Sequence, residues 1–555
     1  MPKAICEAAA GSPANPKITR YEINKANHER FERARHELNA PLVSGGSWNW
    51  PLEDPNRLPS MIVSESGALR ELLAAAQQRR GDPSQGRPWT LVIVRDEFSP
   101  GGVFCVSDGR KGVNFSLAFL ELGARSIRSD SAWFTHVDVR HSWFKQVQGG
   151  WGAMFGKCLK LHLLSPTGLA TAGAPIAVFG TDILIFARVG FMIADLDNHR
   201  MSLNSNGANG FRPRLRRCNV LKKSSGTAEL DPARFVEISC ADPTRFRLRT
   251  SADAFAAADF VSAAHARWTA GAMAKDRFET LQMMRGLKFA PHGILLDPEL
   301  RHHVDVVDSA VIDWVHAALK DGAFTTEVIL LAQACGDELG VKFENLREHM
   351  KGGWLQPARG RAKSKELHKI FDECRSPKED KMRASASELH GMHALLRRIV
   401  ELRLLGAALD KQAASFQAAC ATLDMICAVK QGSVGSREGA AQLRRVRAEH
   451  LRLHREACGT ANTLPKHHMM FDAADQWSVT SFCSKELLAE CAFAPLLTAN
   501  TRHWWRRSST RSGCQRAPTD GRLEAPTRQA WRAGAVLSAP ARYMCGDDVA
   551  VLRLA

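Results

Sequence analysis

Residues 191–220 read FMIADLDNHRMSLNSNGANGFRPRLRRCNV, and this stretch decides the fold that we expect. An apolar run typical of a buried strand ends at Asp195, and a Gly-containing turn and a cluster of arginines follow. Asp195 is preferred over Asp197 as a functional carboxylate because it ends the apolar run directly, so that the strand fixes the direction of its side chain. A strand-end aspartate that only caps the next turn or helix is the alternative.

A second aspartate ends an earlier apolar run. In PWTLVIVRDEF (88–98), a nearly all-apolar segment reaches Asp96, which predicts a strand covered on both faces. Carboxylates at the ends of adjacent central strands suit Mg²⁺ or Mn²⁺, which prefer hard oxygen ligands. Two such ions, roughly 3.5–4 Å apart, activate a water or 3′-hydroxyl and stabilise the leaving oxygen. Asp96 and Asp195 are therefore the expected metal ligands and catalytic residues.

The elements between these aspartates predict the fold class. A hairpin with Asp108-Gly109 at its turn follows the first strand, and a strand over 133–140, a helix within 146–164 and a strand over 182–195 come next. This order of strand, strand, strand, helix, strand matches an RNase H-like α/β core. Order alone is a weak argument, because many α/β domains begin in a similar way.

Composition changes along the chain suggest four regions. A flexible N-terminal arm over 1–60 precedes the α/β core over 61–244, and a large helical region over 245–475 follows. The tail over 476–555 is expected to be irregular and disordered. It has no lysine after Lys485, which indicates either a message read out of frame or a basic disordered tail.

The overall charge favours a polyanionic partner. The chain has 555 residues, enough for two or three domains, and a formal net charge of +17. Such an excess favours nucleic acid first and an anionic membrane surface second, with an inert basic surface as the alternative.

Cysteine usage and the apolar windows bear on location. Fourteen cysteines occur with no Cys-x-x-Cys pair, which fits a reducing compartment. The N-terminus lacks the order of a signal peptide. The most apolar window, 174–194, contains Asp182 and Arg188, so we expect two core strands and not a membrane span. A soluble, intracellular protein is expected.

Four segments together resemble a known family. They are the region around Asp96, the stretch 191–220, the motif DWVH at 313–316 and the segment TLPKHHMMFD at 463–472. They resemble the CACTA-like and Kyakuja-Dileera-Zisupton-like eukaryotic DDE transposases, over roughly residues 85–475. The resemblance implies two-metal cutting and rejoining of transposon ends, with Asp96 and Asp195 as the first metal ligands. It places Asp313 and His316 beside the site in a supporting role; a local bond between residues i and i+3 of a helix is the alternative.

The chain departs from the family pattern at two places. The expected Cys-x-x-Cys falls on Arg214 and Arg217, and arginine cannot bind zinc, so no zinc is expected there. These arginines either hold phosphate or mark decay of the motif. The glutamate of a basic helix is also missing, so the third acidic ligand is Glu486, Glu490 or lost, and impaired catalysis is expected.

The partner expected is DNA, either transposon ends or any sequence, with no membrane partner; a homo-oligomer is left open. The candidate nucleic-acid-binding residues are Arg214, Arg216, Arg217, Lys222, Lys223 and Lys466. Nuclear residence follows only from this substrate, the cytoplasm being the alternative. The histidine pairs at 302–303 and 467–468 are expected at the surface.

Three readings remain open. The chain is a DDE transposase, a decayed or domesticated derivative that binds DNA or chromatin without chemistry, or an unrelated α/β protein whose aspartates are only caps.

Overall fold

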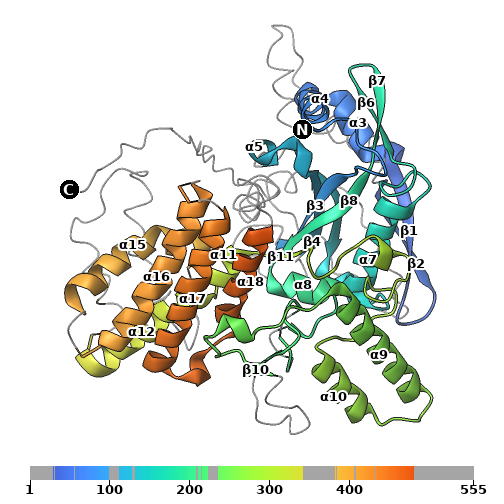
Figure 1. The fold of residues 1–555 in the computed structure, drawn as a ribbon. Helices are drawn as coiled ribbons and strands as arrows, with labels where there is room; N and C mark the ends of the chain where they lie inside the picture. Colours follow the sequence, from blue (N-terminus) through green and yellow to red (C-terminus); the bar gives the residue numbers. More distant parts are fainter. Residues whose placement is uncertain are drawn as a thin grey trace, which may run out of the picture. The chain divides into compact units, whose positions relative to one another are not determined.

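A five-stranded mixed sheet forms the centre of the protein in the computed structural model (Figure 1). Its strands are β3 (Trp89–Phe98), β4 (Gly112–Phe119), β5 (Phe134–Arg140), β8 (Ala187–Ala194) and β11 (Ala310–Ile312), in the order β11-β8-β3-β4-β5. β3, β4 and β5 form an antiparallel meander, and β8 and β11 run parallel to β3 on its other side. The carboxyl ends of β3, β5, β8 and β11 therefore all lie at one edge of the sheet.

The structure describes most of the chain up to residue 479. The described ranges are 32–54, 57–98, 112–127, 132–207, 210–213, 215–222, 235–341, 384–404, 408–431 and 436–479, with a few single residues beside them. All of them belong to one unit, which spans residues 1–510. The predicted turn at Asp108-Gly109 and the predicted tail lie outside these ranges.

Both faces of the sheet are buried, as the apolar run in β3 predicts. Leu91 and Ile93 belong to a core shared with Phe155 of α7 (Gly150–Leu164). Val92 and Val94 belong to a second core, formed largely by the C-terminal helices. Because successive side chains of a strand point to opposite faces, a strand between two cores is apolar at every position.

The N-terminal segment contributes to the first core. β1 (Arg35–Pro41) and β2 (Ser47–Glu53) form an antiparallel hairpin, followed by α3 (Arg57–Glu65) and α4 (Gly67–Arg80). Trp50 and Leu52 of this hairpin are buried in the core. The structure thus differs from a flexible arm over 1–60, because these apolar side chains gain free energy when they leave water.

The second core is helical. α12 (Ala323–Leu339), α15 (Ala386–Arg403), α16 (Asp410–Lys430) and α17 (Ser436–Cys458) pack with α18 (Pro465–Val479). Within the helical region predicted over 245–475, residues 386–430 thus form two helices, α15 and α16. The remaining helices and strands are α5 (Ala124–Ile127), α6 (His141–Phe144), β6 (Ala174–Val178), β7 (Thr181–Ile185), α8 (Leu196–Ser202), β9 (Val220–Leu221), β10 (Val236–Glu237), α9 (Ser251–Thr269), α10 (Lys275–Arg285) and α11 (Trp314–Ala318).

The apolar window 174–194 forms three strands, where the sequence predicted two. β6 and β7 pair as an antiparallel hairpin, and β8 joins the central sheet. Among the described residues, no helix is both long enough and apolar enough to cross a membrane. The mixed α/β class that the sequence predicts is confirmed.

One strand of the sheet comes from the region over 245–475 that is predicted to be mainly helical. β11 has only three residues, Ala310–Ile312, which is too short for a recognisable alternating pattern. Its outer edge is covered by Gln476 of α18, whose amide oxygen accepts a bond from the Ile312 N–H at 3.3 Å and whose amide nitrogen donates to the Ala310 carbonyl at 2.5 Å. This side chain therefore takes the place of a neighbouring strand.

We expect Gln476→Leu to destabilise the protein by about 1–3 kcal/mol, because it leaves two backbone groups of β11 buried without partners. Gln442→Leu on α17 is the control, since the Gln442 side chain bonds Glu438 at the surface. Unfolding in urea measures both variants. Equal stability of the two variants would contradict this role for Gln476.

Candidate functional site

Asp195 lies at the carboxyl end of β8, as predicted. It is the N-cap of α8, and one carboxylate oxygen accepts a hydrogen bond from the Asn198 backbone N–H at 2.6 Å. Within the described part of the chain, the other oxygen accepts no hydrogen bond, and the residue is half-buried. The cap role is thus present, and it leaves one oxygen for a cation.

Asp313 occupies the corresponding position after β11. Ile312 pairs with Ala194, and the Asp313 backbone N–H donates to the Ala194 carbonyl at 3.1 Å, so Asp195 and Asp313 end adjacent parallel strands. The Asp313 carboxylate is 2 % exposed. One oxygen caps α11 through the Val315 N–H at 2.8 Å, and the other lies 2.6 Å from Nδ1 of His316. The local bond between residues i and i+3 is therefore present.

Asp96 lies in β3, the strand on the other side of β8. Val94 pairs with Ile193, so position 96 comes after the last paired residues of β3 and β8. The backbone thus brings positions 96, 195 and 313 level with one another on three neighbouring parallel strands, although β3 continues two residues beyond Asp96, which does not end its strand as predicted. The Asp96 side chain lies outside what the structure describes.

A buried arginine connects these three strand ends, and sequence reasoning missed it. Arg95 is 1 % exposed; its Nη2 donates to Nδ1 of His199 at 3.0 Å, and His199 Nε2 donates to the Val311 carbonyl at 2.8 Å. Burial lowers the pKa of Arg95 to about 9, and the nearby negative charge of Asp195 opposes this shift. Burial and the Arg95 charge lower the pKa of His199 to about 3, so the imidazole is neutral. An arginine inside an apolar run was the available signal.

Lys466 approaches the same strand ends from α18. Its ammonium group donates to the Lys320 carbonyl at 2.9 Å and interacts electrostatically with Asp321, Asp195 and Asp197. Burial lowers the pKa of Lys466, and these carboxylates oppose the shift. The predicted lysine is thus a half-buried cation beside the aspartates.

The arginines after the Gly-containing turn are mostly internal. Arg217 pairs with Asp472 at 2.9 Å and with Asp475, both on α18, and Arg216 donates to the Val307 carbonyl at 2.7 Å. Both arginines are buried, so they stabilise contacts between distant segments and do not face solvent. Lys222 is exposed.

The remaining candidate residues cannot be placed. Arg214, Lys223, Glu486 and Glu490 lie outside the described ranges.

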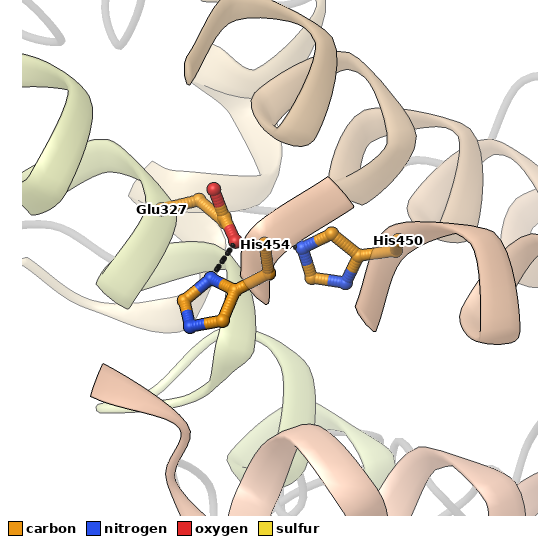
Figure 2. A group of neighbouring side chains, drawn as sticks. All are labelled: Glu327, His450 and His454. Atoms are coloured by element: carbon orange, nitrogen blue, oxygen red, sulfur yellow. Dashed lines mark hydrogen bonds and ion pairs between the residues drawn. The ribbon is translucent and has the colours of Figure 1, made fainter. Parts of the chain in front are cut away.

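A second cluster of ionisable side chains lies in the helical core (Figure 2). Oε1 of Glu327, on α12, lies 2.8 Å from Nε2 of His450 and 2.6 Å from Nδ1 of His454, both on α17. Its Oε2 accepts a hydrogen bond from Ser415 of α16 at 2.9 Å. Oε1 of the carboxylate and the two ring nitrogens lie within 4.8 Å of one another, so this group could hold a metal ion.

Arg447 determines where the protons of this cluster lie. Its Nη1 faces Nδ1 of His450, and its Nη2 donates to the His467 carbonyl at 2.6 Å. Because a guanidinium group only donates, Nδ1 of His450 accepts, and its proton lies on Nε2, toward Glu327. Without metal, the ionised Glu327 and the charged Arg447 balance each other across a neutral His450. A metal ion on His450 Nε2 would require Arg447 to move.

The histidine pair at 467–468 is buried, which corrects the expected surface location. Both side chains are 0 % exposed. The His467 ring packs 4.4 Å from that of His454, and the His468 ring packs 4.0 Å from that of Phe246. The spacing of His450 and His454, i and i+4 on one helix face, was the signal for this cluster.

Comparisons with known proteins add no relative. No protein-family model matches the chain, and a search among curated proteins returns no significant match.

We expect Glu327→Gln to lower the free energy of unfolding by about 3–5 kcal/mol, because it leaves the buried Arg447 charge without a counter-charge. Glu449→Gln, at an exposed position of α17, is the control and is expected to cost a small fraction of that. Urea unfolding at pH 7 measures both. A Glu327→Gln variant as stable as the control would show that Glu327 does not compensate a buried charge.

Stability is expected to fall steeply below about pH 6. Burial lowers the pKa of His162 and of His450 to about 4, with the Arg447 charge adding to the shift at His450, and that of His199 to about 3. Because the unfolded chain binds these protons near pH 6.5, the contribution is full above that pH. As the pH falls below 6.5, each of these histidines lowers the free energy of unfolding by about 1.4 kcal/mol per pH unit, until the pH reaches its pKa in the folded protein.

Thermal unfolding between pH 7.5 and 4.5 at constant ionic strength measures this dependence. An unfolding temperature that stays level across that interval would contradict the neutral, buried state of the histidines.

Proposed function

We propose that this protein is a transposase-derived DNA-binding protein whose sheet is an RNase H-like core. The observation that carries the proposal is that positions 96, 195 and 313 come level with one another on three adjacent parallel strands, near the carboxyl end of β3 and directly after β8 and β11. An antiparallel meander followed by two strands parallel to its first strand is the arrangement expected of that core. The third reading, in which Asp96 and Asp195 are distant caps, requires these positions to lie apart.

The residues at the strand ends suit a divalent cation. Asp195 has an oxygen that accepts no hydrogen bond from the described residues, and carboxylate oxygens are the ligands that Mg²⁺ and Mn²⁺ prefer. Asp96 and Asp195 would hold the ions, which supply an activated water or 3′-hydroxyl and stabilise the leaving oxygen.

The neighbouring residues would position this site. The Asp313 carboxylate caps α11 and contacts His316, and the Asp313 backbone N–H bonds the Ala194 carbonyl, which holds the start of α11 against the end of β8. Arg95 and His199 connect β3, α8 and β11, which keeps the strand ends in register. Lys466 would place a positive charge where a phosphate group approaches the carboxylates.

A second candidate is a DNA- or chromatin-binding protein that has lost this chemistry. The lack of the basic helix that carries the third acidic ligand in the family favours impaired catalysis, whereas DNA binding depends on the summed charge, which is +17. The two candidates share the substrate and differ only in the reaction.

We expect nicking of duplex DNA in Mn²⁺ or Mg²⁺ to be weak and to be abolished by Asp195→Asn. Asp197→Asn, which changes an exposed carboxylate on the same helix, is the control and should retain activity. Nicking that survives Asp195→Asn would rule out the proposed metal site. DNA binding whose logarithm falls linearly with log salt, with no nicking by the wild type, would favour the non-catalytic candidate.

Absence of any salt-dependent DNA binding would contradict both candidates.

A further inference from the structure

We propose that a basic pocket beside α7 binds a backbone phosphate of the DNA strand. The pocket has a volume of about 200 Å³. It is formed by the segment after β5, the start of α7, the end of α8 and the neighbourhood of Lys288. This inference rests on the proposed function and adds where the substrate backbone is held.

The charge of the pocket is positive. Lys145, Arg200 and Lys288 line it, and no acidic residue is among its described lining residues. Lys145 and Lys288 are exposed and form no ion pair within the described part of the chain. Arg200 shares its charge with Asp197 through a contact of 3.1 Å. The two lysines therefore lack a protein counter-charge, which favours an anionic ligand.

Neutral donors complete the pocket. α7 begins after Gly149 without a side-chain cap; the Gly150 N–H donates to the Val147 carbonyl at 3.0 Å, and the next N–H groups, those of Trp151 and Gly152, remain for an anion. Ser205 also lines the pocket and is only 8 % exposed, yet its hydroxyl has no partner among the described residues. This hydroxyl can therefore donate a hydrogen bond to a ligand in the pocket.

The chain before α7 is fixed in the conformation that presents these donors. Gly149 has φ +75°, and a Cβ at this position would lie 2.4 Å from the Pro291 carbonyl oxygen. Both the conformation and the close approach therefore require glycine. The helix start is thus held against the segment that carries Lys288.

The pocket lies at the same edge of the sheet as the aspartates. β5 runs parallel to β3, and Lys145 follows the end of β5. α8 begins after Asp195 and carries Arg200, which places the two residues about 8 Å apart along the helix axis. Figure 1 shows α8 beside the sheet and close to α7. A phosphate in the pocket would therefore hold a nearby part of the strand that reaches Asp195.

The test uses a double variant, Lys145→Gln with Lys288→Gln, in the full chain. Fluorescence anisotropy with a labelled oligonucleotide is measured at several salt concentrations. We expect about tenfold weaker binding at moderate salt. We also expect the slope of log affinity against log salt concentration (the salt slope) to be shallower by about 2, because each lysine that contacts phosphate releases about one counterion. Lys411→Gln, an exposed lysine on α16, is the control and is expected to change binding less than twofold.

A second readout separates this inference from the proposed function. Inorganic phosphate should raise the unfolding temperature of the wild type more than chloride at equal ionic strength, and the double variant should lose that difference. Asp195→Asn, which removes a proposed metal ligand and keeps both lysines, should abolish nicking while retaining the phosphate stabilisation and the salt slope of the wild type.

Two results would overturn the inference. One is a double variant that binds the oligonucleotide with the affinity and salt slope of the Lys411→Gln control. The other is phosphate stabilisation that depends on the two lysines in a protein that binds no DNA, which would assign the pocket to a different phosphate-bearing ligand and remove the proposed function as well.

Discussion

The pairing of β8 with strands on both sides is the constraint on which the rest of the structure depends. β8 is the only described strand that joins the antiparallel meander to β11, and it lies between two hydrophobic cores. A one-residue slip of β8 would turn its buried side chains toward the wrong core. The same register determines that Asp195 comes level with the end of β11. The register of β8 therefore determines both the packing of the two cores and the geometry of the candidate site.

Buried arginines are the second recurring element. Arg95, Arg217 and Arg447 are each at most 5 % exposed, and each bonds a partner from a distant part of the sequence. Removing a charge from water is costly, so such a side chain stabilises the fold only when its partner is in place. The net charge of +17 counts these arginines together with their buried carboxylate partners, so a polyanion at the surface meets neither.

The sequence predicted the strand ends better than the residues around them. An apolar run that stops at a carboxylate is a local pattern, and Asp195 is found where that pattern predicts. β11 was missed because three residues carry no periodicity, and its place in the sheet depends on pairing with a strand more than 100 residues earlier. The burial of Arg216, Arg217, His467 and His468 was also missed. Their polarity indicates the surface unless partners such as Asp472 are known.

Gln476 has a consequence beyond the stability of α18. The outer groups of an edge strand ordinarily offer a template on which another chain can add a strand, which leads to aggregation or to peptide capture. At β11 the amide of one glutamine bonds the Ala310 carbonyl and the Ile312 N–H. A single side chain thus closes this end of the sheet to strand addition from another molecule.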